Sequence, residues 1–139
     1  MSYQRDIRIE FNHCDPAGIV FFPRYFEMMN SMAENFFRDR LAYPFEDITL
    51  RDGFGVPTVR LETDFRAPSR LGDLVRFTLV VKGVGRSSLD LHHSARLGDE
   101  LRLEARQRLV WISGEGHAAP WPGALRAALE QELNEGSSR

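Results

Sequence analysis

The chain has 139 residues, of which 42% are hydrophobic, 11% aromatic and 27% charged. That length and composition indicate one globular domain, residues 1–139, with enough apolar side chains for a core. Eighteen basic and twenty acidic residues give a net charge of −2, which argues against nucleic-acid binding, and a single cysteine, Cys14, rules out an internal disulfide framework.

The opening residues carry charge where a secretion signal would be apolar, and no apolar run approaches the ~18 residues that a membrane-spanning helix needs. We therefore expect a cytoplasmic protein that does not bind membranes.

An alternating pattern begins the chain. Ile7, Ile9 and Phe11 share one face of residues 5–12 and polar side chains occupy the other, which predicts a half-buried strand. An apolar loop without periodicity follows and ends at Pro23. Because proline at the first helical position loses no hydrogen bond, Pro23 is the predicted start of a helix.

A helical period continues to about residue 40. Its apolar face is broad and aromatic, and it consists of Tyr25, Phe26, Met29, Met32, Ala33, Phe36 and Phe37. A face of that width needs a large partner surface, such as a sheet laid across the helix.

Four strand-like runs come next, at residues 59–66, 75–81, 89–97 and 101–111, and glycine-containing turns separate them. Short turns between long strands predict an antiparallel meander. A second amphipathic helix is predicted after Pro122 and Gly123. The order β-α-β-β-β-β-α indicates an α+β fold, a long apolar helix wrapped by an antiparallel sheet, and disfavours a Rossmann fold.

Common catalytic motifs are missing from the sequence, which holds no Walker A, GxGxxG, GxSxG or HExxH pattern. The four histidines lack the spacing of a metal site, and His92 and His93 would point to opposite faces of a strand. We therefore predict no metal centre.

The segment before the long helix is the best candidate for a reactive site. Asp15 lies in an otherwise apolar stretch, where desolvation would raise its pKa, and Gly18 allows a close approach of the backbone to a ligand. The helix start offers unpaired N–H groups that could polarise a carbonyl. A carboxylate beside a helix N-terminus could carry out acyl transfer, either as nucleophile or by activating a water molecule.

Residues 13–26, His-Cys-Asp-Pro-Ala-Gly-Ile-Val-Phe-Phe-Pro-Arg-Tyr-Phe, resemble the signature of the 4-hydroxybenzoyl-CoA thioesterase family of hotdog-fold proteins. The likeness extends more weakly over most of the chain through the same order of elements. It implies hydrolysis of an acyl-CoA thioester, of the 4-hydroxybenzoyl-CoA type or with another compact acyl group, without metal or organic cofactor.

The same resemblance implies roles for individual residues. Asp15 matches the catalytic carboxylate, and the backbone N–H of Phe22 matches the donor that polarises the thioester carbonyl. Gly18 and Val20 would line the acyl pocket. His13 stands where some aryl-specific members carry a second acid, and Phe22 stands where fatty-acyl branches carry a histidine, which favours the aryl branch.

For the CoA arm, the resemblance points to Arg86 and Ser87 at the start of a strand, where Arg86 could pair with a phosphate. Sites in this family form between subunits, so we expect a homodimer or homotetramer. Apolar residues on both faces of the last strand, Val110, Trp111 and Ile112, would suit such an interface.

Two other functions stay open at this point. A hydratase or dehydratase on the same fold would usually pair a histidine with an acid, and Phe22 occupies the place of that histidine. A non-catalytic module could bind acyl-CoA or an acyl carrier protein, and Asp15 would then serve as a loop cap.

Overall fold

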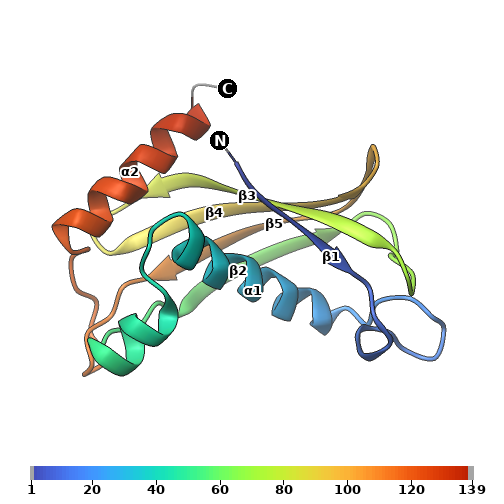
Figure 1. Ribbon diagram of the computed structural model, residues 1–139, viewed down its shortest axis with the longest axis horizontal. Coiled ribbons are helices and arrows are strands. Elements are labelled where there is room, and N and C mark those ends of the chain that lie inside the picture. The colour runs from blue at the N-terminus through green and yellow to red at the C-terminus, as the bar shows by residue number, and fades with distance from the viewer. Residues whose placement is uncertain (1, 138–139) are drawn as a thin grey trace.

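A computed structural model describes residues 2–137. Five strands and two long helices follow in the predicted order (Figure 1). The strands are β1 (Tyr3–Arg8), β2 (Thr58–Phe65), β3 (Leu74–Val84), β4 (Ser88–Leu97) and β5 (Glu100–Val110), and the helices are α1 (Pro23–Asp39) and α2 (Gly123–Ser137). A 3-10 turn at Phe11–His13 and a short π-helical segment at Asp47–Arg51 complete the described elements.

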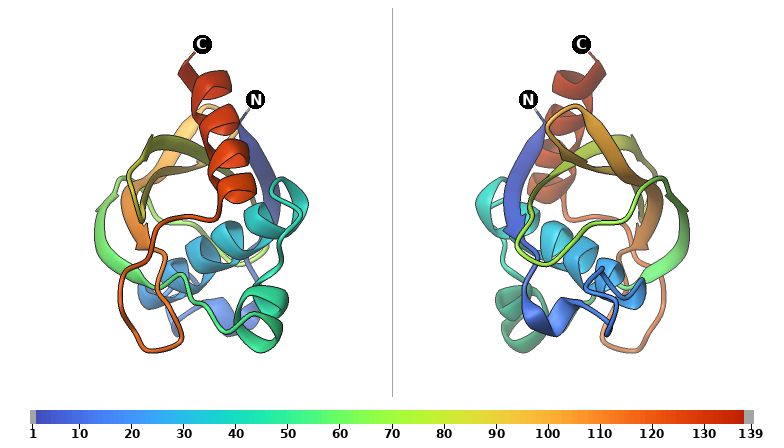
Figure 2. Two further views of the ribbon diagram at one scale, coloured as in Figure 1. Left: turned by 90° about the vertical axis from the view of Figure 1, so that its left-hand side faces the viewer. Right: turned by 90° about the vertical axis from the view of Figure 1, so that its right-hand side faces the viewer.

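The sheet is antiparallel throughout, with the strand order β1-β3-β4-β5-β2. It curls around α1, which lies along its inner face, as the two end-on views show (Figure 2). This arrangement confirms the predicted α+β class and the expected wrapping of one long helix.

The core lies between α1 and the inner face of the sheet. The buried residues of the inner face alternate along β3, β4 and β5, and they are Val75, Phe77, Leu79, Val81, Leu89, Leu91, His93, Ala95, Leu103, Ala105, Gln107 and Leu109. On α1 the buried face matches the predicted one at six positions. Met28 is buried as well, whereas Phe26 is only half-buried.

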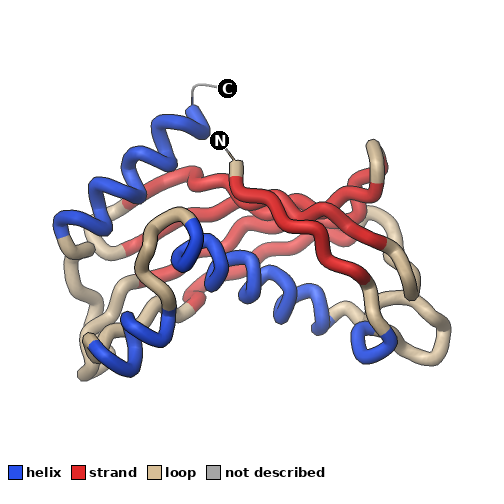
Figure 3. Tube along the Cα trace, viewed as in Figure 1, coloured by secondary structure: helices blue, strands red, loops and turns tan. Residues whose placement is uncertain are grey.

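The predicted meander is wrong at one connection. β2 pairs with β5 rather than β3, so residues 66–73 form a crossing connection instead of a hairpin (Figure 3, tan). The glycine turn at Gly72 exists, with φ +93°, but it ends that connection. The predicted interface strand is also misplaced, because β5 lies between β4 and β2 and Trp111 is fully buried. The strands at the edges of the sheet are β1 and β2.

The first strand ends earlier than predicted. β1 stops at Arg8, and Phe11 belongs to the 3-10 turn, with 84% of its surface exposed. Ile9 is the last buried residue of the alternating pattern, and its N–H donates to the Asp73 carbonyl. The turn breaks the two-residue period after Ile9.

The α2 helix packs against β3 through one face, on which Leu125 and Leu129 are buried. Within residues 2–137, no helix combines the length and the apolar character needed to cross a bilayer.

Candidate active site

Residues 13–21 form a closed hairpin just before α1. The Asp15 N–H donates to the Ile19 carbonyl at 3.0 Å, and the Phe21 N–H donates to the His13 carbonyl at 2.9 Å. An isolated bridge between Cys14 and Val20 lies between these two bonds. Asp15 therefore lies at the tip of the hairpin, and α1 begins directly after the base of the hairpin.

The tip of the hairpin fixes the Asp15 carboxylate. Its Oδ1 accepts a 2.8 Å hydrogen bond from the Ala17 N–H, and the Gly18 N–H donates to the Asp15 carbonyl at 2.9 Å. Gly18 has φ +76°, a conformation that strongly favours glycine, so this turn depends on it. Asp15 is half-buried, and among residues 2–137 no donor reaches its second oxygen.

The start of α1 leaves one backbone donor without a partner. Pro23 is the first helical residue and has no N–H, and the N–H groups of Arg24 and Tyr25 donate to carbonyls of the preceding turn. Among the described residues, no acceptor takes the Phe22 N–H. This donor, at the positive end of the helix dipole, is the one that the sequence predicted.

The crossing connection 66–73 braces the hairpin from the side. The Val20 N–H donates to the Ser69 carbonyl at 2.9 Å, and the Leu71 N–H donates to the Gly18 carbonyl at 3.0 Å. Ser69 is fully buried. The position of the Asp15 hairpin thus depends on a segment some 50 residues later in the sequence.

A buried arginine of β5 anchors this connection. Arg102 donates from one guanidinium nitrogen to the Pro68 carbonyl at 2.9 Å and to the Asp73 carboxylate at 3.0 Å. The Arg70 N–H and then the Arg102 guanidinium hold the pKa of Asp73 below its usual value. Arg102 is 9% exposed and tied to several partners at once, so it fixes the connection more firmly than a surface ion pair would.

A pocket of about 280 Å³ opens beside the helix start. Its lining residues come from the hairpin, the start of α1, the end of β2 and the crossing connection 66–73, and they are Val20, Phe22, Tyr25, Phe65, Arg66, Ala67 and Pro68. Val20 and Tyr25 are buried, whereas Phe22 and Phe65 are 55% and 49% exposed. The two buried residues form the floor, and the exposed rings form the mouth.

The structure places the remaining predicted residues elsewhere. His13 lines a different groove of about 270 Å³ between β1 and α1, beside Arg5 and Arg24. Its Nδ1 accepts the Glu10 N–H, so the proton lies on Nε2. Neither Asp15 nor Gly18 lines the pocket that contains Val20 and Phe22.

Arg86 and Ser87 lie between β3 and β4, at the far end of the sheet from the hairpin (Figure 1). The 11 residues of β3 separate the two ends, which corresponds to roughly 35 Å. One chain therefore does not bring Arg86 to Asp15, and its predicted role in CoA binding stays a prediction.

The sequence did not single out Tyr25 or Phe65 as site residues. Helical and strand periodicity assigned both to the core, and nothing in either pattern distinguishes a core ring from a pocket ring. The order of the strands supplies the missing information, because β2 is an edge strand and its Phe65 lies against Tyr25 beside the pocket.

A buried polar pair lies deeper between helix and sheet. His93 Nε2 donates to Gln107 Oε1 at 2.7 Å, and Gln107 Nε2 donates to the Thr58 hydroxyl at 2.8 Å. Burial lowers the pKa of His93 to about 4, so the ring is neutral. Residues 2–137 contain no group of three or more histidine, cysteine, aspartate or glutamate side chains arranged to hold a metal ion.

Comparison with known proteins gives a consistent family match. Residues 9–129 match the model of the thioesterase-like superfamily. The 4-hydroxybenzoyl-CoA thioesterase of Pseudomonas sp. strain CBS-3 is 32% identical over 88 residues, which cover 63% of this chain and 62% of that protein. The matched region thus spans less than two thirds of this relative.

Solved structures agree over nearly the whole chain. A 4-hydroxybenzoyl-CoA thioesterase, crystallised as an aspartate-to-asparagine mutant with 4-hydroxybenzoyl-CoA, is 25% identical with a TM-score of 0.83, covering 92% of this chain and 98% of that one. A Thermus thermophilus thioesterase complexed with coenzyme A and zinc is 27% identical with a TM-score of 0.79, covering 94% of each chain. A Synechocystis 1,4-dihydroxy-2-naphthoyl-CoA thioesterase shares the fold at 20% identity and a TM-score of 0.84, covering 93% of this chain and 96% of that one. These likenesses confirm the hotdog fold.

Proposed function

The chain belongs to the thioesterase-like superfamily, and from this premise we propose that it hydrolyses acyl-CoA thioesters at the N-terminal end of α1. The observation that carries the proposal is the pairing of two groups on one braced segment. Asp15 presents a carboxylate with an oxygen that no described donor reaches, and the helix start presents the unpaired N–H of Phe22.

The two groups have complementary tasks. The Phe22 N–H would hold the thioester carbonyl and the negative charge that develops on its oxygen, aided by the helix dipole. The Asp15 carboxylate would attack the carbonyl carbon or activate a water molecule to do so. Neither task requires a metal or an organic cofactor.

We place the acyl group in the pocket between Val20, Tyr25 and Phe65. Its aromatic mouth and small volume support an aryl or other compact acyl group over a long fatty chain. The names of one relative and two structural neighbours, which describe hydroxylated aryl-CoA thioesterases, support the same choice.

A second copy of the chain would complete the site. Within residues 2–137, β2 pairs on one side only, and it carries the exposed apolar side chains of Val59 and Phe65. An unprotected apolar edge strand is a site for pairing with another chain. Two-fold pairing there would carry the partner's far sheet end toward this hairpin, and with it the Arg86 expected to bind a CoA phosphate.

The test is hydrolysis of a panel of CoA thioesters, measured by thiol release in the presence of EDTA. The panel contains 4-hydroxybenzoyl, benzoyl, phenylacetyl, acetyl, hexanoyl and palmitoyl groups. We expect turnover of the aryl thioesters, and we expect Asp15→Asn to lower kcat at least ~100-fold, about 2.7 kcal/mol of transition-state stabilisation. Asparagine keeps the oxygen that accepts the Ala17 N–H, so the hairpin should persist.

Asp99→Asn is the matched control, because Asp99 lies exposed in the turn between β4 and β5. It should retain the wild-type kcat. A loss of less than tenfold in Asp15→Asn would remove Asp15 from the chemistry. A folded wild-type protein that hydrolyses no thioester would instead indicate a module that binds acyl groups without cleaving them.

A further inference from the structure

The chain has three tyrosines, and their hydroxyl groups have different surroundings. The Tyr3 hydroxyl donates to the Asp39 carboxylate, and the Tyr43 hydroxyl donates to the Asp52 carboxylate. The Tyr25 hydroxyl is buried and, within residues 2–137, has no hydrogen-bond partner. Leaving a buried hydroxyl unpaired costs about 1–3 kcal/mol, so the sequence keeps this oxygen at the expense of stability.

Tyr25 forms part of the floor of the proposed acyl pocket. The residue is 5% exposed, and its ring lies 5.8 Å from the ring of Phe65 at the mouth. Side chains on a helix lean toward its N-terminus, so the Tyr25 side chain leans toward the turn that carries the Phe22 N–H. An acyl group whose carbonyl is held at Phe22 would therefore extend along Tyr25.

A second unpaired hydroxyl among the described residues belongs to β2 and lies outside the pocket lining. Thr63 Oγ1 is buried without a partner among the described residues, and Thr63 stands two positions before Phe65 on the same face of β2. Two of the four buried side-chain polar atoms that lack partners in residues 2–137 thus flank Phe65. The rest of the floor is apolar, and the Arg66 guanidinium at the mouth is paired with Asp64 and Glu104.

We propose that the Tyr25 hydroxyl hydrogen-bonds an uncharged oxygen substituent on the acyl group, and that it selects hydroxylated acyl groups over their unsubstituted analogues. This inference rests on the proposed thioesterase function, and it names the substituent of the acyl group that the pocket recognises. A hydroxyl can both donate to and accept from another hydroxyl, whereas the apolar floor holds no cation to balance a charged substituent.

The test is Tyr25→Phe, which removes one oxygen and keeps the ring against Phe65. The measured quantity is kcat/KM for 4-hydroxybenzoyl-CoA divided by kcat/KM for benzoyl-CoA. We expect this ratio to fall at least tenfold, through a loss on the hydroxylated substrate alone. The melting temperature of the unliganded protein should stay level or rise, because the variant no longer buries an unpaired hydroxyl.

Tyr43→Phe is the matched control. It removes a hydroxyl that donates to a carboxylate, so it should lower the melting temperature and leave the substrate ratio unchanged. Equal losses on both substrates in Tyr25→Phe would overturn the proposal, because the hydroxyl would then serve the shared thioester. An unchanged ratio, or a weakened assembly seen by sedimentation with the ratio intact, would overturn it as well.

A binding experiment separates this inference from the catalytic proposal. Non-hydrolysable thioether analogues of 4-hydroxybenzoyl-CoA and benzoyl-CoA can be titrated calorimetrically into both proteins. If the wild type prefers the hydroxylated analogue and Tyr25→Phe does not, the selectivity is real even where no thioester is hydrolysed. If neither protein distinguishes the two analogues, the inference is wrong whatever the catalytic result.

Discussion

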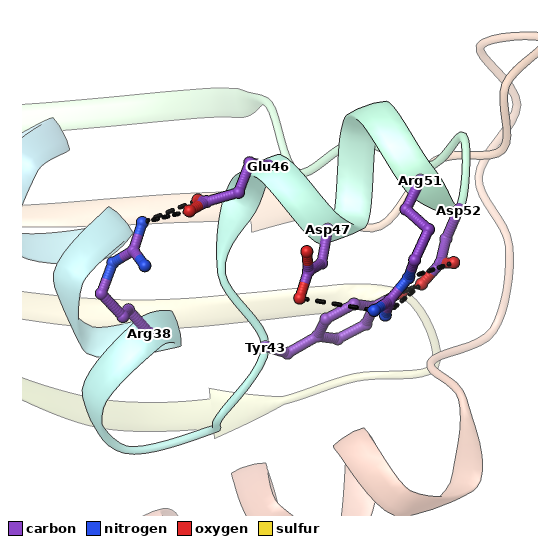
Figure 4. A network of polar contacts seen from close by, with 6 residues as sticks. All are labelled: Arg38, Tyr43, Glu46, Asp47, Arg51 and Asp52. Atoms are coloured by element: carbon purple, nitrogen blue, oxygen red, sulfur yellow. Dashed lines mark hydrogen bonds and ion pairs between the residues drawn. The ribbon is translucent and has the colours of Figure 1, made fainter.

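The two ends of α1 differ in how many of the polar groups near them have hydrogen-bond partners within the chain. Beyond the C-terminal end, Arg38 makes two 2.7 Å hydrogen bonds to the Glu46 carboxylate, and Asp52 accepts from both Arg51 and Tyr43 (Figure 4). Burial and the Asp52 carboxylate raise the pKa of Tyr43 to about 12. At the N-terminal end, the Phe22 N–H and the Tyr25 hydroxyl lack partners among the described residues.

Aromatic rings show the same contrast. Near the C-terminal end, Trp111 is fully buried, stacks on Phe54 at 4.9 Å and contacts Trp121 at 5.4 Å. Near the N-terminal end, the rings of Phe22 and Phe65 meet at 6.2 Å with about half of each surface exposed. The rings at the C-terminal end belong to the buried core, and those at the N-terminal end form the exposed mouth of a pocket.

The largest expected effect is a loss of stability at the C-terminal end of α1. Trp111→Ala should lower the free energy of unfolding by about 3–5 kcal/mol, because it leaves a cavity in the core that the neighbouring side chains cannot fill. Urea unfolding measures this loss, and kcat per folded molecule should stay near wild type. A loss below about 1 kcal/mol would show that the stacked rings at this end contribute little to the core.

A change of pH tests the interior between the two ends. In the unfolded chain His93 binds a proton as the pH falls below about 6.5, whereas the folded protein resists protonation down to about 4. The stability that depends on neutral His93 is therefore present above pH 6.5 and lost as the pH falls toward 4. Between pH 7 and pH 5 the loss should be about 2 kcal/mol by urea unfolding.

Two variants identify the histidine responsible for this loss. His93→Gln places an amide N–H near the position of the imidazole Nε2, so it can still donate to Gln107 Oε1 but does not titrate, and its stability should vary less with pH than that of the wild type. His92→Gln, on the outer face of the sheet, should keep most of the wild-type dependence. An unchanged slope in His93→Gln would assign the acid sensitivity to other groups.

The smallest expected effect on stability is at Phe11, in the turn that precedes the hairpin and the N-terminal end of α1. Phe11→Ser should change the free energy of unfolding by no more than about 0.5 kcal/mol, because the ring is already 84% exposed. The same urea titration measures it. A loss above about 2 kcal/mol would mean that the ring is buried, as its alternating sequence pattern suggested.

The sequence was sufficient for the type and order of the main elements. The helical period predicted the buried face of α1 and Pro23 predicted its first residue, whereas the roles that the family signature implies for Asp15 and Phe22 stay predictions. Local patterns could not reveal which strands pair. Gly72 predicts a turn equally well whether β3 lies beside β2 or across the sheet, and only long-range contacts such as Arg102 with Asp73 decide between the two.

The pocket was beyond sequence reasoning for the same reason. Tyr25 fits the buried stripe of α1 as well as Met29 or Phe36, and its periodicity carries no information about the partner of its hydroxyl. That property appears once β2 is placed at the sheet edge and Phe65 is brought against the ring.

The crossing connection 66–73 also has a consequence for the order of folding. The hairpin of residues 13–21 gains its lateral hydrogen bonds from a segment that must itself be anchored on β5, so three distant parts of the chain meet before the loop is fixed. Contacts of such long sequence separation carry a large loop-closure entropy and form slowly. The neighbouring pairs β3–β4 and β4–β5 close over short turns, so refolding molecules should regain most of their sheet before they regain the braced hairpin of residues 13–21.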